Sequence, residues 1–125
     1  MENETKNIEI MITANTERMY RDVEFLTSVY PPRNHRNYES LEEAASYIEA
    51  EFQKLDCTVE NQHFEVDGRR YRNVIASFNT GRKRRLIIGA HYDVFGDTPG
   101  ADDNASAVAG LMKCARLFDA QRPDI

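Results

Sequence analysis

The sequence predicts an α/β protein, and three observations point to that class. Apolar residues at helical spacing mark two segments in the N-terminal half of the chain. A hairpin pattern follows, and after it comes an apolar run, residues 86–90, typical of a buried strand. A third helical stretch after that run fits a strand-to-helix crossover in an open sheet. With 125 residues, 41% hydrophobic and 30% charged, the chain is long enough for one ordinary globular domain.

Spacing and boundary residues predict the two N-terminal helices. Apolar residues three and four apart over residues 8–30 predict the first helix, which the Pro31-Pro32 pair ends. Ser40 and Glu43 form a capping-box pattern, in which the serine accepts from first-turn amides and the glutamate reaches back. The second helix is therefore predicted to begin at Ser40. Its buried stripe is predicted to comprise Leu41, Ala44, Ala45, Ile48, Phe52 and Leu55.

A hairpin is predicted after the second helix. Residues 58–66 alternate in part between apolar and polar, and they meet an Asp67-Gly68 turn from which residues 71–78 return. The basic run 82–85 then leads into the apolar run. We interpret this basic run as a solvated turn rather than a phosphate or nucleic-acid site, because such charges also discourage edge-to-edge pairing of strands.

Polar side chains gather where the apolar run ends and the third predicted helix, residues 105–118, begins. His91 and Asp93 follow the run directly, and a Gly-containing loop presents Asp102 and Asp103 just before the helix. In α/β sheets, ligands bind at the carboxyl ends of strands and at the N-terminal ends of the following helices. Histidine and carboxylates together suit zinc or another borderline divalent ion. Taken alone, the residues leave open whether Asp93 binds metal or orients His91, and which later aspartate reaches the same ion.

Two motifs resemble the di-zinc aminopeptidase family, which includes bacterial leucyl aminopeptidase, aminopeptidase S and aminopeptidase Y and is related to the glutaminyl cyclases. They are the segments 87–93 and 99–106, and the resemblance extends over residues 40–125. It implies a three-layer α/β/α sandwich with a mixed sheet. Residues 1–125 would then supply the N-terminal part of a single zinc-peptidase catalytic domain.

The resemblance also implies a role for each site residue. His91 would be a ligand of one zinc, Asp103 would bridge two zinc ions, and Asp93 would be the catalytic-site residue that orients His91. The bond between Asp103 and Asn104 matches the position where the family has a cis peptide bond. The family's Glu-Glu pair, whose first glutamate is the general base, has no match in this sequence, and neither do the later Asp and His ligands.

The expected function is therefore that of an N-terminal fragment of a zinc-dependent aminopeptidase, a metallopeptidase that hydrolyses N-terminal bonds of peptide or aminoacyl substrates. The 125-residue chain by itself is expected to be inactive, because it lacks the general base. One alternative is a zinc enzyme similar to glutaminyl cyclase. Another is a truncated, non-enzymatic product that associates with itself through an open sheet edge.

Charge and composition weigh against several other functions. A net charge of -5 argues against nucleic acid as the main partner. No apolar run approaches the roughly 20 residues that span a membrane, and residues 1–7 lack the pattern of a signal peptide, so a cytoplasmic location is expected. Cys57 and Cys114 lie far apart without paired spacing, which fits reduced, structural thiols.

Overall fold

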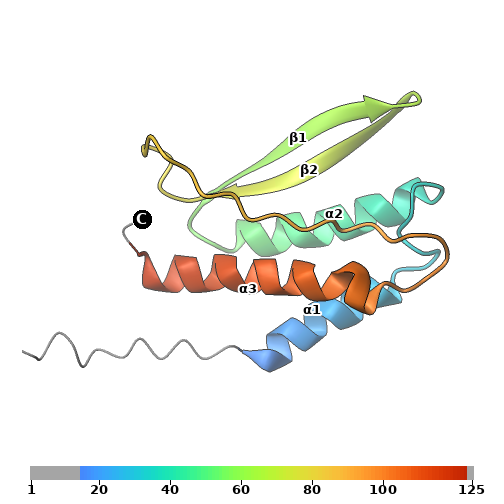
Figure 1. The fold of residues 1–125 in the computed structure, drawn as a ribbon, viewed down its shortest axis with the longest axis horizontal. Helices are drawn as coiled ribbons and strands as arrows, with labels where there is room; N and C mark the ends of the chain where they lie inside the picture. The colour runs from blue at the N-terminus through green and yellow to red at the C-terminus, as the bar shows by residue number, and fades with distance from the viewer. Residues whose placement is uncertain (1–14, 124–125) are drawn as a thin grey trace, which may run out of the picture.

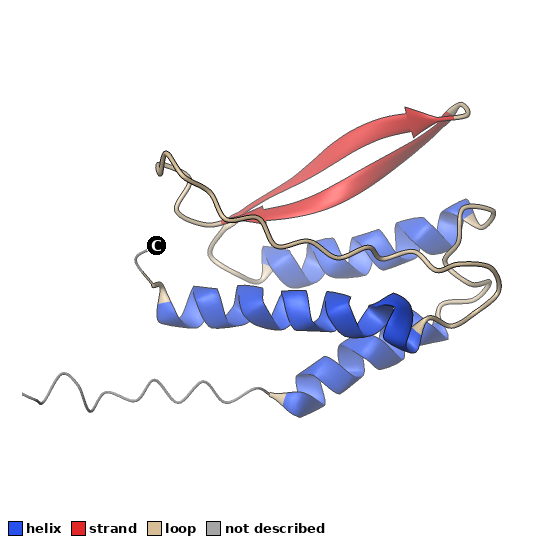
Figure 2. Cartoon of the chain, viewed as in Figure 1, coloured by secondary structure: helices blue, strands red, loops and turns tan. Residues whose placement is uncertain are grey.

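The computed structural model describes residues 15–123, which form three helices and one β-hairpin. The elements follow in the order α1 (Thr16–Ser28), α2 (Tyr38–Gln53), β1 (Thr58–Val66), β2 (Arg69–Ser77), the irregular turn η2 (Ala101–Ala105) and α3 (Ser106–Gln121). The helices pack side by side, and the hairpin lies over α2 (Figure 1; Figure 2 separates helices from strands). The predicted α/β class is confirmed, with a two-stranded antiparallel sheet in the described residues.

Helix α1 is shorter than the helix predicted over residues 8–30. It begins after Asn15, whose side-chain oxygen accepts a hydrogen bond from the Arg18 backbone N–H at 3.1 Å. Ile12, which belongs to the predicted stripe, lies outside the described residues. The helix ends at Ser28 rather than at Tyr30, because the proline that follows Tyr30 restricts the backbone before it.

Helix α2 begins two residues before the predicted start, so the prediction of a capping box at Ser40 is wrong. The main-chain carbonyl of Asn37 accepts from the Ser40 and Leu41 amides, at 3.0 and 3.2 Å. Ser40 is therefore buried inside the first turn, and no side chain caps this helix. The predicted stripe is confirmed over its helical positions, and Leu55, just past the helix, is half-buried against the same core.

The hairpin has the predicted turn. Asp67 and Gly68 both adopt positive φ, 50° and 78°, which suits the tight turns that favour Asp-Gly. β1 pairs antiparallel with β2 from Thr58 opposite Ser77 to Val66 opposite Arg69.

The prediction of a buried strand at residues 86–90 is wrong. This segment is extended and crosses the face between the hairpin and α3 (Figure 1), but it forms no strand ladder. Leu86, Ile87 and Ile88 are 81%, 87% and 59% exposed. An apolar run is buried as a strand only when neighbouring strands and helices cover it, and the described residues cover only Ala90 in part.

The core lies between the three helices. Helix α3 runs three residues past the predicted end at Phe118, to Gln121. The buried cluster comprises Leu26, Ala44, Ile48, Phe52, Ala105, Val108 and Met112. Because Ala105 ends η2, this packing fixes the turn that precedes α3 against the core.

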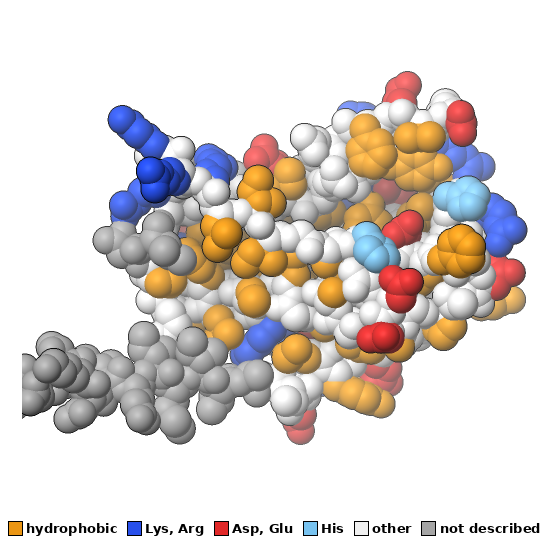
Figure 3. All heavy atoms as spheres, in the orientation of Figure 1, with side chains coloured by type: hydrophobic (Ala, Val, Ile, Leu, Met, Phe, Trp, Pro, Cys, Tyr) orange, Lys and Arg blue, Asp and Glu red, His pale blue; other side chains and the backbone are white. Residues whose placement is uncertain are grey.

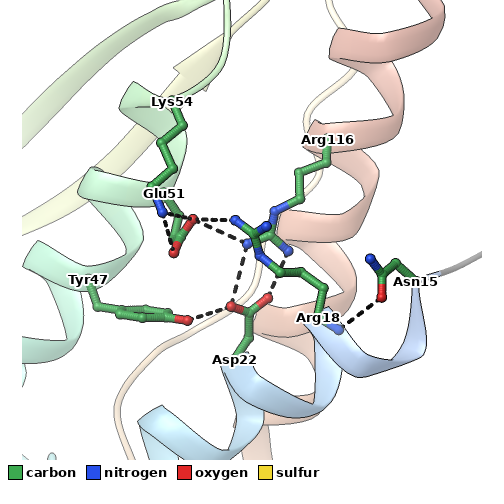
Figure 4. Close-up of polar contacts among 7 residues, drawn as sticks. All are labelled: Asn15, Arg18, Asp22, Tyr47, Glu51, Lys54 and Arg116. Carbon is green, nitrogen blue, oxygen red and sulfur yellow. Dashed lines mark hydrogen bonds and ion pairs between the residues drawn. The ribbon is translucent and has the colours of Figure 1, made fainter.

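A network of charged side chains joins the helices beside that core (Figure 4). Asp22 of α1 is fully buried and pairs with Arg116 of α3 at 2.8 Å. Tyr47 of α2 donates its hydroxyl to Asp22 at 2.6 Å. Burial, followed by the hydrogen bond to Asp22, raises the pKa of Tyr47 above its usual range. Among residues 15–123, no helix is both long and apolar enough to cross a membrane.

Candidate metal centre

The His91 imidazole lies between two carboxylates. Its Nδ1 is 2.9 Å from Oδ1 of Asp93, and its Nε2 is 3.2 Å from Oδ1 of Asp103. His91 and Asp93 follow the extended apolar segment, while Asp103 lies in η2, just before α3. The structure therefore brings together the three residues that the sequence singled out, from segments on either side of a loop.

The backbone of η2 is irregular at the residues that carry this carboxylate. Asp103 and Asn104 have non-helical φ,ψ of -115°, 85° and -140°, 28°. The peptide bond between them is cis, at the position that the family resemblance implies. Asp102 contributes its main-chain carbonyl, which accepts from the Ser106 hydroxyl at 3.0 Å.

The site faces solvent. The side chains of His91, Asp93 and Asp103 are 55%, 57% and 77% exposed. Histidine and acidic side chains gather at the same end of the face drawn in Figure 3. In residues 15–123, no group of three or more His, Cys, Asp or Glu side chains is arranged to hold a metal ion. The described residues thus offer a pair of donors, His91 and Asp103, rather than a complete coordination shell.

The donor pair fits zinc in chemistry and in orientation. Imidazole nitrogen and carboxylate oxygen are both common zinc ligands. A ligating histidine usually gives its other ring N–H to a carboxylate, which fixes the tautomer. Asp93 occupies that place at Nδ1, so Nε2 is the nitrogen directed toward Asp103.

Arg33 is a buried residue that binds the backbone of the site segments, and the sequence did not predict this role. The side chain is 1% exposed and donates to the carbonyls of Tyr92 (2.7 Å), Leu26 (2.8 Å), Pro99 (2.7 Å) and Gly100 (3.1 Å). The sequence places Arg33 in a polar loop after two prolines, where arginine is ordinarily solvated. Nothing local in the sequence marks it as buried.

Tyr92 connects the segment that carries His91 and Asp93 to strand β2. Its hydroxyl donates to the carbonyl of Arg72 on β2 at 2.6 Å. Burial, with a smaller contribution from nearby Glu42, raises the pKa of Tyr92 to about 12. The phenol therefore remains a hydrogen-bond donor at neutral pH.

Gly100 makes the close approach of the loop to η2 possible. It has φ +62°, and a Cβ built there would lie 2.3 Å from Val94 Cγ1 and 2.7 Å from the carbonyl oxygen of Asp103. Its own carbonyl accepts the Ala105 amide at 3.0 Å. A side chain at this position would push apart the two segments that carry His91 and Asp103.

Comparison with known proteins finds a family whose sequence pattern covers the C-terminal part of the chain. Residues 73–125, which include His91, Asp93 and Asp103, match Peptidase family M28. The resemblance to the di-zinc aminopeptidase family is therefore confirmed by a family match and by similar proteins.

Two curated relatives share sequence with most of the chain. The uncharacterized protein YfbL of Escherichia coli K12 is 37% identical over 118 residues, which are 88% of this chain and 36% of that protein. A probable leucine aminopeptidase of Arthroderma otae is 30% identical over 120 residues, 86% of this chain and 31% of that protein. The chain spans about a third of the length of these relatives.

Solved structures with the same fold come from both enzyme types named by the resemblance. A leucine aminopeptidase precursor from Bacteroides thetaiotaomicron matches with a TM-score of 0.79, and a glutaminyl cyclase from Tannerella forsythia with 0.74. A Zn-dependent exopeptidase from Parabacteroides distasonis also gives 0.74. Each is 25% identical, and the match covers 90% of this chain and 44% of the other.

Proposed function

We propose that this chain carries part of the two-zinc centre of an aminopeptidase. His91 and Asp103 would be zinc ligands, Asp103 would be the ligand shared by the two ions, and Asp93 would orient His91. The observation that carries the proposal is the placement of His91 between the two carboxylates, with Nδ1 2.9 Å from Asp93 and Nε2 3.2 Å from Asp103. The match of residues 73–125 to Peptidase family M28 supports it.

The chain's own residues would prepare the site for substrate. With the ring proton on Nδ1, His91 would donate to Asp93 and present the Nε2 lone pair to a ligand. Asp103 presents a carboxylate beside it, at the start of a helix that packs on the core. Zinc, when bound, would act as a Lewis acid toward the carbonyl of an N-terminal peptide bond.

We expect the 125-residue chain alone to be inactive. The part of the chain that the structure describes brings two donors to the site, and its sequence offers no match to the general-base glutamate of the family. An assay of the purified chain with leucine 4-nitroanilide should give no turnover. Turnover that a chelator abolishes would contradict this expectation.

A zinc titration followed by NMR tests the proposed ligands directly. In the wild-type chain, the His91 ring signals should shift, whereas those of His35 and His63, which lie outside the site, should not. His91→Ala and Asp103→Asn should each weaken zinc binding at least tenfold, with His63→Ala as the matched control. If His91→Ala binds zinc as well as wild type, the proposal fails. Structural zinc sites reach about 10–16 kcal/mol, and binding that tight would contradict a two-ligand site.

A glutaminyl-cyclase-like enzyme is the second candidate. The glutaminyl cyclases from Tannerella forsythia and Bacteroides thetaiotaomicron match the same part of the fold, with TM-scores of 0.74 and 0.77. In a polypeptide that carries this chain together with the remainder of the domain, an aminopeptidase should release leucine from leucine 4-nitroanilide. A cyclase should instead convert an N-terminal glutaminyl substrate to a pyroglutamyl product with release of ammonia.

A further inference from the structure

We propose that Arg33 is a positioning residue of the metal centre: its guanidinium sets the separation of His91 and Asp103 by holding both ends of the loop between them. The inference rests on the proposed function, in which those two side chains are the zinc ligands. Arg33 itself does not reach the metal, and it acts through the backbone.

The contacts of Arg33 differ from those of an ordinary ion pair. All four hydrogen-bond acceptors of its side chain in the described residues are main-chain carbonyl oxygens. Burying a guanidinium is costly unless its donors are satisfied, so each of these bonds also stabilises the position of the carbonyl that accepts it. The arrangement specifies the path of the backbone rather than the position of a side chain.

The four carbonyls come from three places in the chain. Leu26 lies in the last turn of α1, where carbonyls lack helical partners and the helix dipole favours a cation. Tyr92 stands between His91 and Asp93. Pro99 and Gly100 begin the segment that leads to Asp103. One planar group therefore ties both ends of the site loop to a helix of the core.

At each end of the loop, the hydrogen bonds from Arg33 lie close in sequence to one of the two proposed ligands, His91 or Asp103. At one end, the Tyr92 carbonyl is one residue from His91. At the other, the Gly100 carbonyl accepts both from Arg33 Nη2 and from the Ala105 amide, which closes the turn around Asp103. A shift of the guanidinium would therefore move the two donors relative to each other.

The main chain beside Arg33 reinforces the attachment. The Arg33 carbonyl accepts the Val94 amide at 3.0 Å. Asn34, which is also fully buried, donates to the carbonyl of Gly96 at 2.7 Å. Burial lowers the pKa of Arg33 and the nearby Asp93 carboxylate opposes that shift, so charge attraction adds to the hydrogen bonds.

Lysine could not replace this arrangement. A guanidinium presents five N–H donors in a rigid plane, whereas an ammonium is a compact group on a flexible stem. Arg33 uses Nε, Nη1 and Nη2 toward separate carbonyls. Arg33→Lys should therefore keep the buried charge but lose the fixed spacing of the loop ends.

A wild-type measurement gives the first test. In the NMR-detected zinc titration of the 125-residue chain, the Arg33 Nε–H signal should shift with the same midpoint as the His91 ring signals. The signals of Arg36, exposed in the same loop, and of Arg116, in the helix network, should not follow. An Arg33 signal that stays in place while His91 shifts would overturn the positioning role.

Variants give the second test. Arg33→Lys and Arg33→Met should weaken zinc binding about tenfold, within the range for residues that orient metal ligands. Arg36→Met and Arg116→Met should stay within twofold of wild type, although Arg116→Met lowers stability. If Arg33→Lys and Arg116→Met weaken zinc binding equally, Arg33 is only a structural residue and the inference is wrong.

Amide hydrogen exchange without zinc separates this inference from the proposed function. Arg33→Lys should speed exchange at Val94 and Ala105 at least tenfold while the core amides of α3 keep their protection. If the wild-type chain shows no zinc shift at His91, the proposed function fails and this measurement still tests Arg33. Uniform loss of protection over all helices, or none at Val94 and Ala105, would overturn the inference.

Discussion

Asp22 and Arg116 form a buried ion pair that joins the first helix to the third. The Arg116 guanidinium contacts both carboxylate oxygens, at 2.8 and 3.4 Å, and Asp22 has no solvent exposure. Tyr47 of α2 donates to the same carboxylate, so residues from three helices meet there (Figure 4). Because the pair joins helices, we expect its effect to be on stability.

Asp22→Ala should therefore destabilise the chain strongly. Removing one partner of a buried pair leaves the other charge without compensation and typically costs about 3–5 kcal/mol. Arg116 keeps a second carboxylate, Glu51, at 3.6 Å, which places the expected loss near the lower end of that range. Urea unfolding of Asp22→Ala and wild type should measure this loss in the free energy of unfolding. The matched control is Glu17→Ala, because Glu17 pairs with Arg21 at the surface, at 3.8 Å; it should change stability by less than about 1 kcal/mol. Equal effects of the two variants would contradict the prediction.

Glu51 should make the fold sensitive to acid. Burial alone would raise its pKa, but hydrogen bonds from Lys54 and Arg18 outweigh burial and hold it below the ordinary 4.5. A carboxylate with a lowered folded pKa stabilises the fold above its unfolded pKa, and that stability is lost as the pH falls through the folded pKa. The free energy of unfolding should thus drop below about pH 4.5. Glu51→Gln should flatten that drop, measured by urea unfolding from neutral pH downward, whereas the exposed Glu17→Gln should leave it as in wild type.

Gly100→Ala should be destabilising where Gly110→Ala is stabilising. At Gly100, φ is +62° and the new Cβ would meet Val94 at 2.3 Å, so left-handed strain of about 1–2 kcal/mol adds to a clash. Gly110 lies within α3, and a Cβ there meets nothing within 4 Å. Alanine should therefore gain about 0.5–1 kcal/mol at that helical position. Thermal unfolding of the two variants would test these opposite changes in stability. A loss of stability in Gly110→Ala would contradict the prediction.

The sequence predicts local elements well because their signals are local. Spacing of apolar residues marks the helices, and the Asp67-Gly68 pair marks the hairpin turn, whose φ values are positive as required. Strand formation at residues 86–90 depends instead on neighbours that cover the run. The described residues do not supply them, so Ile87 is extended and exposed despite a strong strand pattern.

In the candidate site, too, features with a local sequence signal could be predicted and long-range contacts could not. That His91, Asp93 and Asp103 lie close together could be predicted, because the family resemblance rests on contiguous motifs. Arg33 could not, because it lies fifty-nine residues before Tyr92, whose carbonyl it binds, and only the folded chain brings them together. A buried arginine that binds backbone carbonyls has no pattern that distinguishes it from a solvated one.

The exposed apolar segment should make the chain associate with itself. Leu86, Ile87 and Ile88 form a contiguous run of exposed apolar side chains, 81%, 87% and 59% exposed. Such a surface favours contact between copies, and an extended backbone invites strand pairing. The sedimentation coefficient should therefore rise with protein concentration.

Ile87→Lys should reduce this rise, because a lysine on an edge opposes pairing. Tyr20→Lys, at an exposed position on α1 (69%), is the control and should leave association unchanged. A wild-type chain that stays monomeric at all concentrations would contradict the prediction.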